Sequence, residues 1–289
     1  MLNFDAVGES LTSPEFSWTD RDVLLYALAV GASLDDATTD LQFTTENTGG
    51  VDLQVLPTFG ALIAQQAATR PKIGEVPPGM ALHAEQAVTL HAPLPVSARV
   101  RARCTVQGIF DKTSGALVVS DVDVHDAVTG EALVTARSGT FLRGEGGFGG
   151  DRGPRTDWQG PGRAPDTVVS YPTRPDQALL YRLTGDRNPL HSDPALARSC
   201  GTDRPILHGM CTYGFTGRAL LHALCDSDPR RFVSMSGRFT APVLPGDVIS
   251  VSIWDDGGTA QFQTVRADGA VVIDHGVCRY LPAPPQAAK

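Results

Sequence analysis

Residues 19–33, TDRDVLLYALAVGAS, and residues 173–188, TRPDQALLYRLTGDRN, share a plan that decides the fold. Each stretch opens with Thr-x-x-Asp, continues as an apolar run and reaches a glycine. A threonine suits the N-cap of a helix, an aspartate is stabilised near the positive end of the helix dipole, and glycine is common where a helix stops. Each stretch therefore predicts a helix. Because both are apolar on nearly every side, we expect helices enclosed by sheet.

The similarity between the two halves extends beyond these helices. Residues 56–67, LPTFGALIAQQA, correspond to residues 204–221, RPILHGMCTYGFTGRALL, and each predicts a second helix. Residues 92–106 and 241–255 then open runs of strands separated by short Gly-containing turns. Strands that come in runs after the helices disfavour a βαβ alternation. The chain thus predicts an α+β fold of two modules, each a central helix held in a curled antiparallel sheet.

A segment rich in glycine and proline separates the two copies. Residues 144–166, GEGGFGGDRGPRTDWQGPGRAPD, contain eight glycines and three prolines, which is typical of a linker. Bare backbone amides also suit anions, so a phosphate-binding loop is the second interpretation of its Gly-rich start. We predict an N-terminal module over residues 1–143, the linker over 144–166 and a C-terminal module over 167–289.

The composition is that of an ordinary globular protein, with 289 residues of which 42% are hydrophobic and 19% charged. A net charge of −8 does not favour nucleic-acid binding, although a local basic patch could still bind an anion. The five scattered cysteines include no C-x-x-C pair, so neither a disulfide framework nor a zinc site is expected. With no secretory signal and no apolar run of the ~20 residues that a membrane span needs, we expect a cytoplasmic protein.

The two copies differ where the first helix of each ends. The first copy reads LAVGASLDD there, whereas the second reads LTGDRNPLHSDP, residues 183–194. Taken singly, Asp186, Asn188 and His191 are ordinary helix caps or loop residues. Together, across Pro189, a carboxylate and an imidazole that face one gap can hold a water and exchange its protons, which is general acid–base geometry. We therefore expect one site, in the second module, with the first module supporting it.

No other catalytic motif competes with this cluster. The chain has no G-x-S-x-G nucleophile elbow, and no group of His, Cys and Asp has convincing metal-ligand spacing. The pair His208-Gly209 precedes a helix that is predicted to start near Met210. The amides and the positive dipole end at such a helix start suit an oxyanion, and Gly209 would allow a ligand carbonyl to approach closely. A simple turn glycine is the alternative.

Residues 181–197, YRLTGDRNPLHSDPALA, followed by residues 205–221, PILHGMCTYGFTGRALL, closely resemble the hydratase 2 family. These are the MaoC-like (R)-specific 2-enoyl-CoA hydratases, which also occur as a domain of the peroxisomal multifunctional enzyme type 2. The segments YALAVGAS, LPTFG, LHAEQAVTLHAPLPVSARV, DKTSG and GGFGG resemble the same family's first repeat, so the resemblance covers nearly the whole chain. It implies a double hotdog fold.

The resemblance also implies an activity and assigns roles by position. The reaction would be reversible hydration of trans-2-enoyl-CoA to (3R)-3-hydroxyacyl-CoA in fatty acid metabolism, without a metal or redox cofactor. Asp186 and His191 would be the acid–base pair that activates water for attack at C3 and protonates C2. Asn188 would orient the water or the histidine, and the Gly209 amide would hold the thioester oxygen. The first module, which lacks these groups, would accommodate the acyl chain.

Further residues are candidates for contacts with the acyl-CoA substrate. His208 lies beside the expected oxyanion site, and CoA is anionic, so local cations should help. The candidates for substrate binding are His208, Lys112, Arg187, Arg143 and Arg152. Solvated surface charge is an equally good interpretation of each cation, and His83 in LHAEQ is interpreted as a structural histidine.

Three alternatives to a CoA hydratase stay open at this point. A dehydratase could act on acyl groups linked to a carrier protein, a hotdog thioesterase could hydrolyse the thioester, and a non-enzymatic protein could merely bind acyl-CoA. The presence of all three polar residues argues against the last. A homodimer is expected from the family likeness alone.

Overall fold

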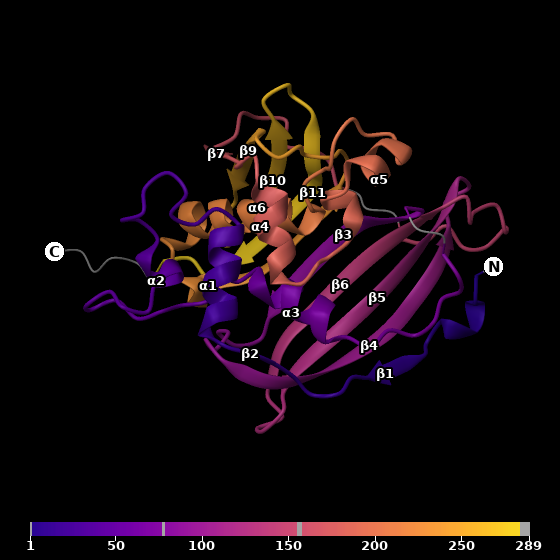
Figure 1. Cartoon of the computed structure of the whole chain (residues 1–289), viewed down its shortest axis with the longest axis horizontal. Helices are drawn as coiled ribbons and strands as arrows, with labels where there is room; N and C mark the ends of the chain where they lie inside the picture. The colour runs from indigo at the N-terminus through magenta and orange to yellow at the C-terminus, as the bar shows by residue number, and fades with distance from the viewer. Residues whose placement is uncertain (1, 77–78, 155–157, 284–289) are drawn as a thin grey trace.

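The computed structural model describes residues 2–76, 79–154 and 158–283. In these residues eleven strands form one antiparallel sheet that runs through both halves of the chain (Figure 1). The strand order is β1-β4-β5-β6-β3-β8-β11-β10-β9-β7, and β2 pairs with β4 as well. The first five strands of this order belong to the first half and the last five to the second, so each half contributes one contiguous part of the sheet.

In the first half, a short 3-10 helix and two short strands precede the α-helices. Its elements are η1 (Phe4–Ala6), β1 (Ser10–Thr12), β2 (Phe16–Trp18), α1 (Asp20–Ala29), α2 (Leu41–Thr44), α3 (Phe59–Ala67), β3 (Ala81–Leu90), β4 (Ala98–Asp111), β5 (Gly115–Asp126) and β6 (Ala132–Arg143). The second half repeats this order. Its elements are β7 (Thr167–Pro172), α4 (Gln177–Tyr181), η2 (Arg182–Thr184), η3 (Pro189–His191), α5 (Pro194–Ser199), α6 (Gly209–Cys225), η4 (Pro229–Arg231), β8 (Phe232–Phe239), β9 (Val248–Asp255), β10 (Thr259–Arg266) and β11 (Val271–Tyr280).

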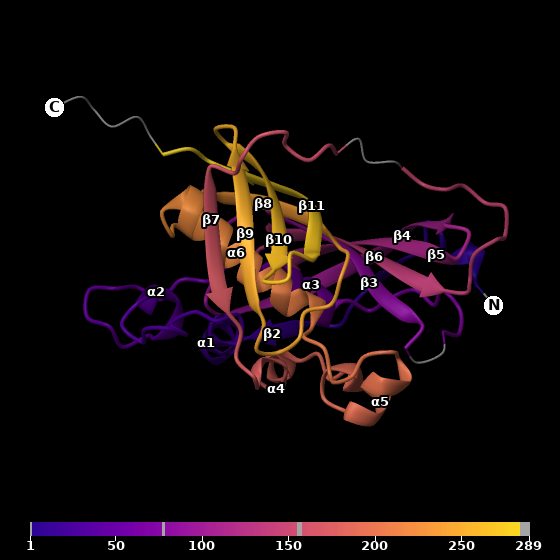
Figure 2. The same cartoon turned by 90° about the horizontal axis from the view of Figure 1, so that it is seen from above.

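The two halves join where β3 pairs with β8. The register runs from Glu85 opposite Arg238 to Thr89 opposite Ser234. The Arg238 Nε lies 3.1 Å from the Glu85 Oε1, so an ion pair crosses the junction. Figure 2 shows the strands of the second half lying beside those of the first. This junction places the second half's catalytic candidates next to the first half's sheet.

Helices α3 and α6 are the central helices of the two modules. Nearly all of α6 is buried, from Met210 to Cys225, and α3 is buried over most of its length. Glycines let these helices approach their neighbours: a Cβ at Gly217 would lie 2.3 Å from Thr58, and one at Gly60 would lie 3.0 Å from Val134. The predicted α+β fold of two modules, with residues 56–67 and 204–221 in corresponding places, is confirmed.

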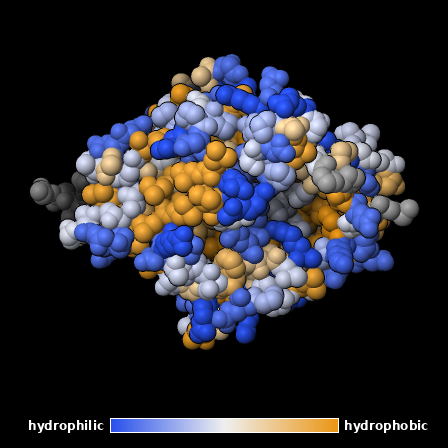
Figure 3. All heavy atoms as spheres, in the orientation of Figure 1, coloured by the Kyte–Doolittle hydropathy of each residue, from blue (hydrophilic) through white to orange (hydrophobic). Residues whose placement is uncertain are grey.

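The first helix of each copy is not enclosed by sheet, contrary to expectation. Helices α1 and α4 pack on each other, with Gln177 Nε2 donating to the Ala29 carbonyl at 2.8 Å, and they leave Leu28 and Leu179 exposed. Figure 3 shows apolar surface on the side where these two helices lie. The central helix α3 is a further apolar partner, since the rings of Tyr26 on α1 and Phe59 on α3 have centroids 5.3 Å apart, so other helices replace the sheet.

The expected threonine caps are found in one copy only. Thr19 is the N-cap of α1, and its N–H donates to the Asp22 carboxylate at 2.8 Å. Thr173 does not cap α4, whose N-cap is Asp176. Instead, the Thr173 hydroxyl donates to the Asp247 carbonyl at 2.8 Å, because β7 continues to Pro172 and pairs with β9 there.

The linker contains neither helix nor strand in its described residues, 144–154 and 158–166. Two of its amides already have an acidic partner: the N–H groups of Gly147 and Gly149 donate to the Asp111 carboxylate at 2.9 and 2.7 Å. The protein's own carboxylate occupies these two amides, which favours the linker interpretation over a phosphate-binding loop. Residues 155–157 lie outside the described residues, and the module boundaries stay a prediction.

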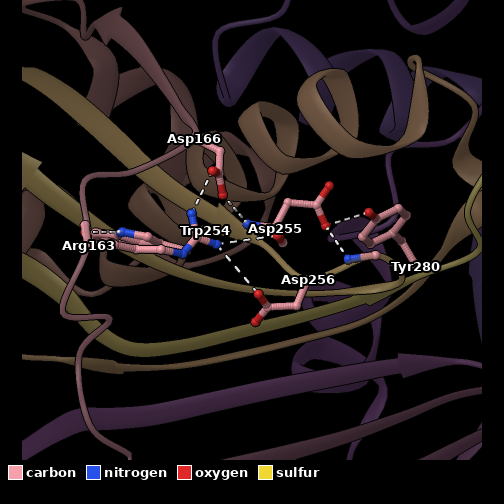
Figure 4. Close-up of polar contacts among 7 residues, drawn as sticks. Arg163, Asp166, Trp254, Asp255, Asp256 and Tyr280 are labelled. Atoms are coloured by element: carbon pink, nitrogen blue, oxygen red, sulfur yellow. Dashed lines mark hydrogen bonds and ion pairs between the residues drawn. The ribbon is translucent and has the colours of Figure 1, made fainter.

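The end of the linker is attached to the second module by a polar cluster (Figure 4). The Arg163 Nη1 lies 2.5 Å from the Asp166 Oδ1, and the Arg163 carbonyl accepts from Trp254 Nε1 at 2.8 Å. Asp166 also accepts from the Asp255 N–H at 2.9 Å. These contacts fix where β7 begins.

In the described part of the chain, no helix is both long and apolar enough to cross a membrane.

Candidate active site

The polar loop of the second copy starts at Gly185, whose backbone conformation favours glycine. Gly185 has φ +130°, and a Cβ there would lie 2.2 Å from Gln66 Nε2 on α3. The Gln66 side-chain amide donates to the Thr184 carbonyl. Glycine is the residue that adopts this φ without strain, and a side chain at position 185 would also displace the Gln66 amide from the Thr184 carbonyl.

Asn188 shapes the loop through its side chain. Its Oδ1 accepts from the Leu190 N–H at 3.0 Å and thereby caps η3, the short 3-10 helix that carries His191. The Asn188 N–H in turn donates to the Asp186 Oδ1 at 3.1 Å. Asp186, Asn188 and His191 are therefore held by one local network, which the spacing across Pro189 makes possible.

His191 is held in one tautomer. Its Nδ1 lies 2.9 Å from the Ile206 carbonyl, which can only accept a hydrogen bond, so Nδ1 carries the proton and Nε2 has the lone pair. Burial lowers the pKa of His191 below its usual value of 6.5, although the nearby Ile206 carbonyl and Asp186 charge oppose this. The ring is therefore neutral at neutral pH, and its Nε2 can accept a proton.

His208 stands directly behind this histidine. The two rings stack with centroids 3.8 Å apart and an interplanar angle of 28°. The His208 Nε2 donates to the Asp186 carbonyl at 3.2 Å. Burial and the proximity of His191 lower the pKa of His208, so it too is neutral. The uncharged His208 ring thus hydrogen-bonds to the Asp186 backbone and stacks on the His191 ring.

The fold brings together a group that could be mistaken for a metal site. One ligand atom from each of Asp186, His191 and His208 lies within 4.8 Å of the others, a proximity that the sequence spacing did not reveal. However, the lone pair of an imidazole nitrogen lies in the ring plane. Two stacked rings therefore direct their lone pairs side by side rather than at one ion. The residues fit a water between a carboxylate and an imidazole better than a metal.

Gly209 begins α6, one residue before the predicted start. The first N–H groups of a helix have no intrahelical acceptor and lie at the positive end of its dipole. Gly209 lines the same cavity as Asp186 and His191. A carbonyl oxygen bound in this cavity can therefore accept from a helix N-terminus close to the acid–base pair.

The cavity has a volume of about 650 Å³ and lies between the two halves. This is within the range of small-molecule sites. The second half contributes Asp186, Asn188, Leu190, His191, Ile206, Gly209 and Phe239, among others. The first half contributes residues of α3, β3, β5 and β6, including Ala61, Ala64, His83, Val122, Ala136, Ser138 and Thr140.

The structure separates the substrate-binding candidates. Arg143 lines the cavity, whereas Lys112, Arg152 and Arg187 are not among the described residues that line it. The Lys112 Nζ donates to the backbone carbonyl of Arg152, a linker residue, so the Lys112 side chain lies against the linker. His208 is buried behind the wall rather than on it.

Sequence reasoning missed two cavity residues of the first half. His83, interpreted as structural, lines the cavity and packs edge-on against Phe239 with ring centroids 5.0 Å apart. Arg70 also lines the cavity. His83 could have been found from its place on the strand that joins the modules, but Arg70 lies in a loop between elements and carries no local signal.

Comparisons with known proteins agree with this geometry. Residues 16–144 match the model described as MFE-2 hydratase 2 N-terminal domain, and residues 157–276 match the MaoC like domain. The chain is 45% identical to the 3-hydroxyacyl-thioester dehydratase Y of Mycobacterium tuberculosis, over 96% of this chain and 98% of that protein. This chain belongs to the MaoC-like hydratase 2 family.

Two further members of the MaoC-like hydratase 2 family support that placement. The enoyl-CoA hydratase ChsH3 of Mycobacterium tuberculosis is 42% identical over 93% of this chain and 95% of its own length. The solved structure of a MaoC-like dehydratase from Phytophthora capsici matches with a TM-score of 0.87 and 31% identity, covering 99% of this chain and all of that one. The expected family and the double hotdog fold are confirmed.

Proposed function

We propose that this protein is an (R)-specific 2-enoyl-CoA hydratase, a hydro-lyase that converts trans-2-enoyl-CoA to (3R)-3-hydroxyacyl-CoA and back. One observation carries the proposal: a cavity wall holds the Asp186 carboxylate and a neutral His191 within water-bridging distance of each other. Relatives named enoyl-CoA hydratase and 3-hydroxyacyl-thioester dehydratase support the same reaction in its two directions.

The geometry suits addition of water to one face of the double bond. A water between Asp186 and His191 gives a proton to the His191 Nε2 as its oxygen bonds to C3. The electrons of the C2–C3 double bond then shift toward the thioester oxygen, where the Gly209 N–H stabilises the enolate. The acid–base pair returns a proton to C2, so one water is added and no net proton is released. Both additions come from the side of Asp186 and His191.

The remaining groups act by positioning. Asn188 caps η3 and so holds His191, while His208 packs behind the His191 ring. Of the cations that the sequence suggested for substrate binding, Arg143 lines the cavity, and we assign it to the anionic CoA moiety.

Asp186 and His191 can perform all the proton transfers of the reaction, and we propose that no metal or redox cofactor takes part. Treatment with EDTA should leave activity unchanged.

A coupled assay tests the function. On adding protein, the enoyl absorbance of crotonyl-CoA should fall, and the product should be oxidised by an (R)-specific but not an (S)-specific 3-hydroxyacyl-CoA dehydrogenase. Product accepted only by the (S)-specific enzyme would contradict the assigned face.

The same assay separates the alternatives. Release of free CoA without hydration would identify a thioesterase. Hydration of crotonyl groups on a carrier protein, with none on CoA, would identify a carrier-protein dehydratase. Binding without turnover would leave the acyl-CoA-binding role. A cytoplasmic location, a role in β-oxidation and a homodimer stay predictions, and sedimentation of the purified protein tests the last.

A further inference from the structure

Thr212 is a buried polar residue of the cavity that the proposed mechanism does not use. It lies on α6, three residues after Gly209, and only 3% of its surface is exposed. Residues three apart share one face of a helix, and both Gly209 and Thr212 line the cavity. The cavity therefore meets this face of α6 along the first turn of the helix.

The Thr212 hydroxyl has no partner within the described part of the protein. Its oxygen forms no hydrogen bond with a described residue, and it is not among the side-chain atoms that are both unpartnered and sealed from solvent. Since Thr212 lines the cavity, its hydroxyl opens onto that space. Loss of hydration without a hydrogen bond in return destabilises a protein, so the missing partner of this hydroxyl points to a bound molecule.

Thr216, one turn further along α6, shows the contrast. Its hydroxyl donates to the Thr212 backbone carbonyl at 2.9 Å, and its oxygen lies 2.8 Å from the Thr264 hydroxyl. Thr216 is not among the described residues that line the cavity. Of these two threonines, the one whose hydroxyl lacks a protein partner is the one on the cavity wall.

Helix geometry places the Thr212 hydroxyl near the Gly209 amide. The N–H groups of a helix point toward its N-terminus, and the side chains lean in the same direction. The N-cap residue His208 makes no side-chain capping bond, and the Gly209 N–H donates to no described residue. An oxygen atom bound at the first turn of α6 can therefore accept from the Gly209 N–H and from the Thr212 hydroxyl together.

We propose that the Thr212 hydroxyl is a second hydrogen-bond donor to the thioester oxygen of the substrate. As water bonds to C3, the electrons of the C2–C3 double bond form a C1–C2 double bond, and the carbonyl oxygen becomes an enolate oxygen. Thr212 keeps its proton and strengthens its hydrogen bond to this oxygen. The carbonyl forms again when C2 takes its proton. This inference rests on the proposed hydratase function and adds a catalytic residue to it.

Thr212→Val removes the hydroxyl and keeps the shape of the side chain. We expect kcat for crotonyl-CoA hydration to fall by about 10²-fold with KM little changed, since an oxyanion donor acts mainly in the transition state. Thr212→Ser, which keeps a hydroxyl, should retain most of the activity.

Thermal unfolding separates this role from a structural one. Thr212→Val should unfold at or above the wild-type temperature, because the substitution breaks no hydrogen bond to a described residue. Thr216→Val should unfold at a lower temperature, because it breaks the bonds to the Thr212 carbonyl and to the Thr264 hydroxyl.

A carbonyl resonance reports the proposed hydrogen bond directly. Crotonyl-CoA labelled with 13C at C1, bound to the slow Asp186→Asn variant, should show a downfield carbonyl shift that Thr212→Val reduces. Thr240→Val is the matched control, because Thr240 also lines the cavity but its hydroxyl donates to the Val271 carbonyl at 2.7 Å. The control should change neither the carbonyl shift nor kcat.

Three outcomes would overturn the inference. Thr212→Val could keep the wild-type kcat, or it could leave the carbonyl shift unchanged. Thirdly, Thr212→Ser could lose as much activity as Thr212→Val, which would make the packing of the side chain the cause. Failure of the proposed function is distinguishable, because wild-type protein would then not hydrate crotonyl-CoA at all.

Discussion

His191 and His208 stack with their ring centroids 3.8 Å apart, and each ring has one nitrogen hydrogen-bonded to a backbone carbonyl. The carbonyl of Ile206 fixes the tautomer of the first ring, and the carbonyl of Asp186 fixes that of the second. Burial keeps both rings neutral. A protonated pair would place two positive charges face to face, so this arrangement favours one histidine that accepts a proton transiently.

Asp186→Asn should reduce kcat for crotonyl-CoA hydration by about 10²- to 10⁴-fold, the usual contribution of a general acid–base group. The asparagine oxygen can still accept from the Asn188 N–H, so the loop should keep its shape. Asp193→Asn is the matched control, because Asp193 only caps α5 through the Ala195 N–H and an asparagine caps equally well. Wild-type activity in the Asp186 variant would remove this residue from the mechanism.

The pH profile of kcat/KM should report the titration of His191. The histidine must be neutral to accept a proton from water, and its pKa is lowered by burial. Activity should therefore persist as the pH falls through 6.5 and decline only at lower pH, where the ring becomes charged. His191→Gln should remove this acid limb together with most of the activity. An acid limb centred above pH 7 would be inconsistent with a buried, neutral ring.

Folding stability should fall as the medium is acidified. Burial lowers the pKa of His83 from 6.5 to about 4, so between these pH values the unfolded chain binds a proton that the folded chain does not. Stability therefore rises with pH across this window and is lost as the pH falls from 6.5 toward 4. Urea unfolding at several pH values measures the slope.

His83→Gln should flatten that slope, whereas His125→Gln, which changes an exposed histidine of β5, should not. An unchanged slope in the His83 variant would show that its ring stays accessible to protons in the folded state.

Gly185→Ala should impair both folding and activity. The substitution adds a Cβ that would meet Gln66 at 2.2 Å, in a backbone conformation with φ +130° that L residues rarely adopt. Gly201→Ala separates the two causes, because Gly201 has φ +88° but nothing within 4 Å of an added Cβ. We expect Gly201→Ala to cost about 1 kcal/mol in unfolding free energy and Gly185→Ala more, with a loss of hydration activity in the latter alone. Equal effects of the two substitutions would show that the Gln66 contact is unimportant.

The fold was predictable from the sequence because the two halves repeat the same local helix and strand patterns. The apolar runs that end at Gly31 and Gly185 and the linker between the halves indicated two modules, and the correspondence of residues 56–67 with 204–221 indicated the helices α3 and α6. The first strands of both modules were missed, since β1 and β2 have three residues each and the partner of β7 is β9, about 80 residues further along the chain. The enclosure of α1 and α4 was also wrong, because an apolar helix can bury one side on another helix instead of a sheet.

Within the site, the sequence by itself determined that Asp186, Asn188 and His191 share one loop, because their spacing across Pro189 is a local property of the chain. Only the tertiary structure placed His208 behind His191 and brought His83 and Arg70 of the first half to the cavity wall. It also left Lys112, Arg152 and Arg187 off that wall. Such neighbours depend on the pairing of β3 with β8, whose residues lie far apart along the chain. Their contacts arise only when the two halves close into one sheet.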